Sequence, residues 1–323
     1  MENHTVMVMA DPADPQLAML QQLPEETSIA VGITPEAFER VTPTATVLLN
    51  WSLVRDLMRD LFVAAPNLRW IHTRSAGLDN LLFPELVESP VILTNGTGVF
   101  SQSLGEFVVG AILYFAKDFR RMARSQMAGV WDPFDITEVA GQTVGIVGYG
   151  DIGRAVATRV RALGMRVLAV KRQGPPLYNM DPLVSQIFAP GRRAEMIAQC
   201  DYLVMSAPLT PQTRGMIGEA EFAIMKPNCV VINVGRGPVV DEAAMVGALS
   251  EGRIKGAALD VFDQEPLPDG HPFYKLENVL LSAHCADHTP DWMEQAMRFF
   301  IEQFERFRTG VPLMNIVEKK LGY

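Results

Sequence analysis

The sequence has few cysteines, no long hydrophobic run and no excess of positive charge. Its three cysteines, Cys200, Cys229 and Cys285, lie far apart and without CxxC spacing. They argue against a structural zinc site, predict no metal, and indicate a reducing compartment. The longest apolar run, residues 107–116, is too short to span a bilayer. The N-terminal residues show no signal-peptide pattern, so a cytoplasmic protein is expected.

The charge balance excludes further classes of partner. A net charge of −9 and a pI of about 5.1 disfavour nucleic acid and anionic lipid. The sequence contains neither an internal repeat nor a low-complexity segment. The composition, with 48% hydrophobic and 20% charged residues, is typical of a globular enzyme. A length of 323 residues predicts two domains.

The first hundred residues alternate short apolar runs with polar or helical stretches. They predict a small α/β domain with a parallel sheet and no dinucleotide fingerprint of its own. The expected strands are residues 6–9, 29–32, 47–50, 70–73 and 91–94, with helices between them, such as 53–62. A long helix over 101–123 and an irregular connection over 124–142 should follow.

Residues 143–172 carry the pattern of a dinucleotide site. An apolar strand, 144–147, runs into Gly148-Tyr149-Gly150-Asp151-Ile152-Gly153, and helical spacing over 154–163 leads to a second strand, 167–170. In such a unit Gly148 permits the turn, Gly150 lets the backbone approach a pyrophosphate, and Gly153 allows close helix packing. The helix N-terminus attracts the phosphate. The alternative is a purely structural glycine turn.

The end of the second strand favours NADP(H) over NAD(H). An NAD-binding unit usually places Asp or Glu there, whereas this sequence has Lys171 and Arg172. Two cations attract a 2′-phosphate and offer no acceptor for a free ribose diol. A solvated basic strand end is the alternative.

Three candidate catalytic residues follow the ends of later strands. Strands are expected at 202–206, 230–234, 256–261 and 279–282, an irregular stretch at 175–193, and a last amphipathic helix at 290–308. Arg236, Glu265 and His284 each come just after a strand. A 2-oxo acid needs a guanidinium for its carboxylate and carbonyl and an acid to protonate the reduced oxygen. Singly, each residue has an ordinary structural alternative, such as a packed histidine or a surface cation.

Two strand ends of the first domain suggest a substrate site. Ser75, Ala76 and Gly77 follow the fourth strand, where small residues let backbone N–H groups reach an anion. Trp51 follows the third strand and is a candidate pocket wall. The alternatives are an ordinary turn and a core tryptophan.

These motifs resemble those of the D-isomer-specific 2-hydroxyacid dehydrogenase family. The resemblance is densest in VGIVGYGDIG, SAPLTPQTRGMIG, INVGRGPVVDE, ALDVFDQEPLP and LLSAHCADHTP. It implies an α/β fold of two Rossmann-like or flavodoxin-like domains with parallel sheets and the active site in the cleft between them. Residues 1–100 and 288–323 would form a discontinuous substrate domain, and 101–287 the dinucleotide-binding domain.

The resemblance also implies roles. Arg236 would bind the substrate, His284 would act as acid or base, Glu265 would hold His284, and the backbone at Ala76 and Gly77 would assist at the carboxylate. Cofactor contacts would come from Asp151 and Ile152 at the pyrophosphate, Pro208 at the adenosine, and Val234 and Asp260 near the nicotinamide. Ala207 and Gly235 are further candidate cofactor-binding residues. A homodimer formed largely through the cofactor domains is implied as well.

Two departures from the family pattern stand out. Lys171 occupies the place of an Asp in NAD-preferring members. Asp287 replaces the common small residue after His284, where it can reshape the pocket or pair with His288, an alternative acid.

The sequence thus predicts an NADPH-dependent reductase of small 2-oxo acids, with glyoxylate or hydroxypyruvate as leading substrates. One alternative is a cofactor-sensing interaction protein that binds NADP(H) without hydride transfer. The other is a dehydrogenase of a small anion such as phosphite or formate.

Overall fold

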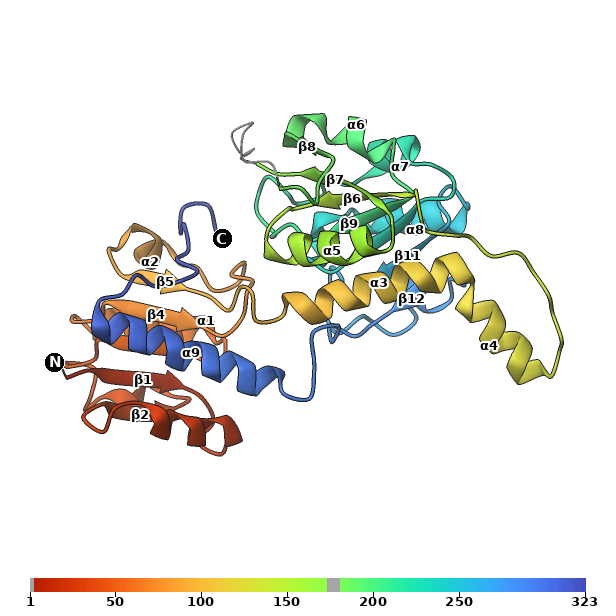
Figure 1. Ribbon diagram of the computed structural model, residues 1–323. Coiled ribbons are helices and arrows are strands. Elements are labelled where there is room, and N and C mark those ends of the chain that lie inside the picture. The colour runs from red at the N-terminus through yellow and green to blue at the C-terminus, as the bar shows by residue number, and fades with distance from the viewer. Residues whose placement is uncertain (1–2, 173–180) are drawn as a thin grey trace. The chain divides into compact units, whose positions relative to one another are not determined.

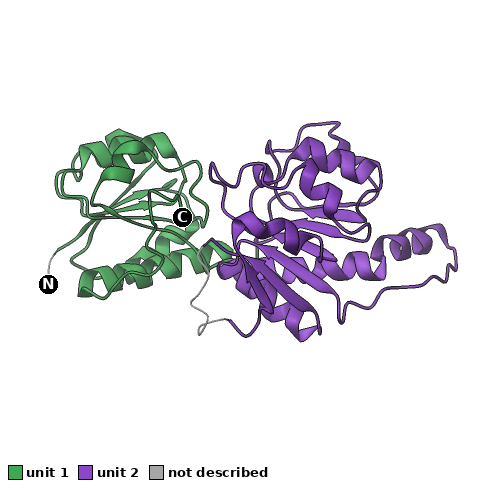
Figure 2. Ribbon diagram, turned by 90° about the horizontal axis from the view of Figure 1, so that it is seen from above, with its two compact units in different colours: residues 1–100, 289–323 green, residues 101–288 purple. Residues whose placement is uncertain are grey.

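The computed structural model describes residues 3–172 and 181–323. The chain divides into two compact units, coloured separately in Figure 2. Unit 1 comprises Met1–Phe100 and Thr289–Tyr323, and unit 2 comprises Ser101–His288. The boundary expected from the sequence, between residues 287 and 288, lies one residue earlier. No helix of the described residues is both long and apolar enough to cross a bilayer.

Unit 1 is a doubly wound α/β unit. Its five parallel strands are β1 (Thr5–Met9), β2 (Ser28–Gly32), β3 (Val47–Asn50), β4 (Trp70–Thr73) and β5 (Ile92–Thr94), in the order β2-β1-β3-β4-β5. The helices are α1 (Arg55–Ala64), α2 (Pro84–Glu88) and α9 (Trp292–Thr309). All four residues of β3 and of β4 are buried, as expected for strands of a parallel sheet that is covered on both faces. All five predicted strands are confirmed.

Helix α9 and the C-terminal tail complete unit 1 from the far end of the sequence. Figure 1 shows α9 lying along the sheet, where Phe300 stacks on Trp70 with ring centroids 5.6 Å apart. Farther on, the Lys319 ammonium donates to the carbonyl oxygens of Leu86, Ser89 and Val91 at 2.6–2.9 Å. Residues 289–323 therefore pack with residues 1–100, both in the core and at the edge of unit 1.

A buried histidine in β4 predicts an acid-sensitive unit 1. His72 is 1% exposed, its Nδ1 lies 2.8 Å from Thr94 Oγ1, and burial lowers its pKa to about 3 from 6.5. Between pH 6.5 and about pH 3 the His72 ring is protonated in the unfolded chain but neutral in the folded chain. The free energy of unfolding therefore falls as the pH falls toward 3, by about 1 kcal/mol per pH unit. Above pH 6.5 the ring is neutral in both states, so His72 no longer makes the free energy of unfolding depend on pH.

The test is urea unfolding of the wild type and His72→Phe, a variant without a titrating ring, across that pH window. We expect the variant to lose less of its unfolding free energy on acidification than the wild type. Parallel pH dependences in the two proteins would contradict the assignment.

Unit 2 contains a seven-stranded parallel sheet in the order β12-β11-β10-β9-β6-β7-β8. The strands are β6 (Thr143–Val147), β7 (Arg166–Val170), β8 (Gln186–Phe188), β9 (Tyr202–Met205), β10 (Val230–Asn233), β11 (Gly256–Leu259) and β12 (Val279–Leu281). The helices are α3 (Ser101–Lys117), α4 (Phe119–Ala128), α5 (Asp151–Ala162), α6 (Arg193–Ile197), α7 (Glu219–Ile224) and α8 (Glu242–Ser250). The strand order reverses between β6 and β9, the switch point at which such sheets bind ligands.

Three local predictions are wrong in unit 2. The connection expected to be irregular over 124–142 begins inside α4, which ends at Ala128. The single helix expected over 101–123 ends at Lys117, because Asp118 adopts a left-handed conformation (φ 49°) and its side chain accepts a hydrogen bond from the Arg121 N–H at the start of α4. The stretch expected to be irregular, 175–193, contains β8, which pairs with β7. Residues 175–180 of that stretch lie outside the described residues.

Candidate active site

The glycine turn after β6 has the geometry of a dinucleotide cradle. Gly148 has φ 95°, and a Cβ there would lie 2.5 Å from the Ala207 nitrogen. At Gly153 an added Cβ would lie 2.7 Å from the carbonyl oxygen of Gly148, so glycine is what lets α5 pack on the strand. Gly150, in contrast, has no heavy atom of the described residues within 4 Å of its Cβ position. Internal packing does not demand glycine there, whereas the close approach of a ligand does.

The start of α5 is open to an anion. Gly150 caps the helix without a side-chain hydrogen bond, which leaves the first-turn N–H groups of Asp151 and Ile152 for a phosphate. The turn itself is held from β9, because the Ser206 hydroxyl donates to the Gly148 carbonyl oxygen at 2.9 Å. These residues therefore fit a dinucleotide.

The basic pair stands where the sequence predicts it. Lys171 and Arg172 follow β7 directly and are exposed, and the Lys171 N–H donates to the Phe188 carbonyl of β8. The other predicted cofactor residues also follow strand ends of this sheet: Ala207 and Pro208 come after β9, Val234 and Gly235 after β10, and Asp260 after β11.

Arg236 lies in a tight turn after β10. Its carbonyl oxygen accepts a hydrogen bond from Asn233 Nδ2 at 3.1 Å, and its Nη1 donates to the Gly235 carbonyl at 2.9 Å. The next residue, Gly237, runs so close to the backbone of Phe262 that a Cβ would overlap the carbonyl group there. This contact joins the Arg236 turn to the loop after β11.

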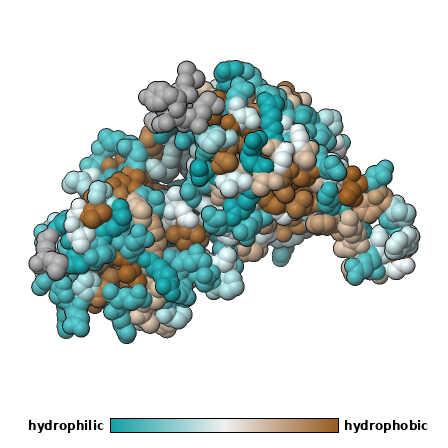
Figure 3. Space-filling view, in the orientation of Figure 1, coloured by the Kyte–Doolittle hydropathy of each residue, from teal (hydrophilic) through white to brown (hydrophobic). Residues whose placement is uncertain are grey.

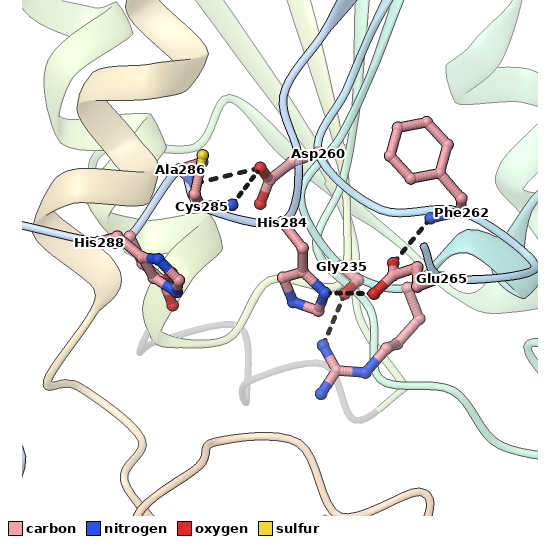
Figure 4. A network of polar contacts seen from close by, with 10 residues as sticks. Gly235, Asp260, Phe262, Glu265, His284, Cys285, Ala286 and His288 are labelled. Carbon is pink, nitrogen blue, oxygen red and sulfur yellow. Dashed lines mark hydrogen bonds and ion pairs between the residues drawn. The ribbon is translucent and has the colours of Figure 1, made fainter. Parts of the chain in front are cut away.

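Glu265 and His284 form a pair at the neighbouring strand ends. Glu265 Oε2 lies 2.6 Å from His284 Nδ1, while Oε1 accepts the Phe262 N–H at 2.9 Å. Figure 4 shows the His284 ring turned toward Glu265 and His288 standing apart from the pair. The carboxylate fixes the orientation of the ring. His284 itself has φ 51°, a left-handed conformation of the kind found at functional sites.

Asp260 positions the loop that carries His284. Its Oδ1 accepts the N–H groups of Cys285 and Ala286 at 3.0 and 3.1 Å, as Figure 4 shows. The side chain is 2% exposed. The structure thus gives Asp260 a positioning role that the sequence did not suggest, and its predicted place near the nicotinamide stays a prediction.

The two residues that depart from the family pattern lie together. His288 Nε2 is 3.7 Å from Asp287 Oδ1, and burial raises the pKa of the Asp287 carboxyl. Among the described residues, no group of three or more His, Cys, Asp or Glu side chains is arranged for a metal ion.

The substrate residues predicted in unit 1 lie at the carboxyl ends of β3 and β4. Ser75 Oγ donates to the Gly77 carbonyl at 2.9 Å, and Asn95 Nδ2 donates to that of Ala76 at 2.7 Å, which fixes the loop. Trp51 is 2% exposed and its indole N–H donates to Asp14 Oδ2 at 2.8 Å. Arg74, which the sequence reasoning left without a role, lies over the Trp51 ring.

A seven-stranded parallel sheet with a glycine cradle at its switch point, beside a carboxylate–histidine pair, defines the class of nucleotide-dependent oxidoreductases. The pattern of the family described as D-isomer specific 2-hydroxyacid dehydrogenase, NAD binding domain, matches residues 109–286. The chain belongs to this family of oxidoreductases, as the sequence motifs indicate.

Individual relatives agree with this membership. The chain is 32% identical over 271 residues to a glyoxylate reductase of Korarchaeum cryptofilum, covering 81% of this chain and 80% of that one. It is 30% identical over 331 residues to a D-3-phosphoglycerate dehydrogenase of Methanocaldococcus jannaschii, covering 98% of this chain but only 61% of that protein's length.

A solved structure is similar along the entire chain. The NADPH-dependent glyoxylate/hydroxypyruvate reductase of Sinorhizobium meliloti, in complex with NADP and sulfate, has a TM-score of 0.83, 26% identity and complete coverage of both chains. The predicted two-domain α/β fold with parallel sheets is thereby confirmed.

Proposed function

We propose that the protein reduces a small 2-oxo acid, of the glyoxylate or hydroxypyruvate class, to the D-2-hydroxy acid with NADPH. The observation that carries the proposal is the His284–Glu265 pair, positioned on strand ends next to that of Arg236 and in the same sheet as the glycine cradle. The names of the glyoxylate reductases among its relatives support the substrate class.

Each residue has a chemical task in this reaction. The Arg236 guanidinium binds the substrate carboxylate and polarises the keto oxygen, and the N–H groups of Ala76 and Gly77 assist at the carboxylate. The nicotinamide cofactor, when bound, supplies the hydride. Gly150, Asp151 and Ile152 hold its pyrophosphate.

His284 supplies the proton. Because Nδ1 is engaged by Glu265 Oε2 at 2.6 Å, Nε2 is the atom that donates a proton to the keto oxygen as the hydride reaches the carbon. The ring is then neutral and keeps its Nδ1–H on the carboxylate. In the reverse direction the same nitrogen accepts the proton.

The test is a spectrophotometric panel of 2-oxo acids with NADPH and NADH in parallel. We expect NADPH oxidation with glyoxylate or hydroxypyruvate and a D-2-hydroxy acid product. Cofactor binding without turnover of any 2-oxo acid would overturn the proposal in favour of a sensing protein. NADP⁺ reduction by phosphite or formate alone would overturn it in favour of a small-anion dehydrogenase.

The cofactor preference depends on the charge after β7. Replacing Lys171 by Asp removes a cation from the 2′-phosphate and adds an acceptor for the ribose diol. We expect the ratio of kcat/KM for NADPH over that for NADH to fall at least about tenfold. Lys275→Asp, at an exposed lysine outside the predicted cofactor site, is the matched control. An unchanged ratio in Lys171→Asp would contradict the charge argument.

A homodimer formed through unit 2 is the second part of the proposal. Helix α4 buries none of its residues in this chain, and Met127 and Trp131 are 89% and 95% exposed. Figure 3 shows further hydrophobic residues gathered over unit 2 in the region of α3. An apolar surface of this kind is typical of a subunit interface.

Sedimentation velocity tests the dimer. The wild type should sediment at twice the chain mass. The double variant Met122→Asp, Met127→Asp changes two exposed methionines of α4, 41% and 89% exposed, and should sediment at the monomer mass, because charges then replace apolar contacts. Val63→Asp, which changes a residue 68% exposed on α1 of unit 1, should remain a dimer. A monomeric wild type, or a double variant that still dimerises, refutes this interface.

A further inference from the structure

The loop that carries Glu265, residues 261–271, has little main-chain support. None of the backbone N–H groups over 262–267 donates to a backbone carbonyl among the described residues, and most residues of the loop are exposed. Within the loop, Glu265 Oε1 accepts the Phe262 N–H at 2.9 Å, as Figure 4 shows. The place of Glu265 relative to His284 therefore depends on side chains that hold this loop from outside.

Glu242, the first residue of α8, holds the Glu265 loop at two points. Its Oε2 accepts the Asp263 N–H at 3.4 Å, and its Oε1 lies 3.1 Å from His271 Nε2. The second contact of His271 fixes its tautomer: Nδ1 accepts the Phe273 N–H, so the ring proton is on Nε2 and is donated to Glu242. One carboxylate thus binds the loop on both sides of Glu265.

The charges around Glu242 do not account for a carboxylate at this position. Asp263, a charged neighbour in the loop, has the same sign, and its pKa is raised by burial and by the charge of Glu242. Arg214 acts on the Asp263 pKa in the opposite direction. The start of α8 favours a negative charge, because the helix dipole is positive there, but only the two loop donors use both oxygens of Glu242.

We propose that Glu242 is a positioning residue for catalysis: by holding the loop on both sides of Glu265, it sets the place of the carboxylate that orients His284. This inference rests on the proposed function, in which His284 supplies the proton. The contact between Glu265 Oε2 and His284 Nδ1 is 2.6 Å long, so a loop displacement of about 1 Å exceeds hydrogen-bond distance. Displacements of this size cost about a hundredfold in rate.

Steady-state kinetics with the 2-oxo acid and NADPH test the proposal. Glu242→Ala should lower kcat by at least about tenfold, with both KM values within a few fold, because proton transfer is affected and the glycine cradle is not. Glu242→Gln, whose amide oxygen accepts only one of the two donors, should lose part of that activity. His271→Asn keeps an acceptor for the Phe273 N–H but removes the donor to Glu242, so it should also lower kcat.

A double-mutant cycle with Glu265→Gln separates positioning from stability. If Glu242 acts through Glu265, then Glu242→Ala should cost less than about threefold in kcat once that carboxylate is absent. The matched control is Glu219→Ala, which removes the carboxylate that begins α7 and its ion pair with Arg253. Its kcat should stay near the wild-type value. An equal loss from Glu242→Ala with and without Glu265 overturns the proposal, because it identifies a purely structural role.

Nuclear magnetic resonance measures the same effect without turnover. The carbon-bound ring protons of His284, identified by their absence in His284→Ala, should shift in Glu265→Gln because the carboxylate is lost. In Glu242→Gln they should shift in the same direction, and in Glu219→Ala they should stay in place. Signals that do not move in Glu265→Gln or in Glu242→Gln refute the proposal even if the panel finds glyoxylate reduction. Signals that move support it even if the panel finds no reductase, so the two proposals can fail separately.

Discussion

His284→Ala should lower kcat for the 2-oxo acid by about a thousandfold, within the range that removal of a general acid produces. The imidazole is the group whose Nδ1 is held by Glu265 at 2.6 Å, so its loss removes both the proton donor and the reason for that carboxylate's position. Cofactor affinity should change little, because the glycine cradle after β6 is untouched. Steady-state kinetics and a fluorescence titration with NADPH measure the two effects.

His288→Ala is the control for this prediction. His288 lies in the same loop, beside Asp287 at 3.7 Å, but away from the Glu265–His284 pair (Figure 4). We expect its replacement to change kcat by only a few fold. A thousandfold loss in His288→Ala, with a nearly active His284→Ala, would make His288 the acid.

The second large effect should come from a single methyl group at Gly237. A Cβ there overlaps the Phe262 carbonyl group, so the turn carrying Arg236 and the loop carrying Glu265 must move apart. Displacements of about 1 Å cost about a hundredfold in rate, and overpacking of a tight contact costs about 1–3 kcal/mol of stability. Gly237→Ala should therefore lose at least about a hundredfold in kcat/KM, beyond its loss in thermal stability.

Gly191→Ala shows whether that loss is specific. An added Cβ at Gly191 meets no heavy atom of the described residues within 4 Å, so both activity and melting temperature should stay near the wild-type values. A fully active Gly237→Ala would mean that the Arg236 turn and the Glu265 loop need not be held together for catalysis.

Much of the fold could be predicted because buried parallel strands have a simple sequence signature. Runs such as residues 47–49 and 230–232 are apolar throughout, since both faces of the sheet are covered. The helix break at Asp118 was missed because the apolar pattern runs through it, and only the left-handed backbone and the cap on Arg121 N–H end α3. The three-residue strand β8 was missed because it depends on pairing with β7 rather than on its own composition.

The candidate site was likewise predictable in part from the sequence. Parallel strands end at one edge of a sheet, so the chain order alone brought Arg236, Glu265 and His284 to neighbouring ends in unit 2. Two features depend on tertiary contacts and could not be predicted from the order of the strands. These are the hydrogen bonds from the His284 loop to Asp260 and the position of Arg74 between two indoles. A hint of the latter was present in the arginine directly before Ser75-Ala76-Gly77.

The division of unit 1 between the two ends of the chain bears on the order of synthesis. All residues of unit 2, 101–288, leave the ribosome as one continuous stretch. The sheet of the first hundred residues is completed only later, when α9 packs on Trp70 and Lys319 donates to the carbonyls of Leu86, Ser89 and Val91. Until then a nascent apolar face stays open to chaperones and to aggregation. Unit 2 can therefore complete its fold before unit 1 does, although unit 1 begins earlier in the sequence.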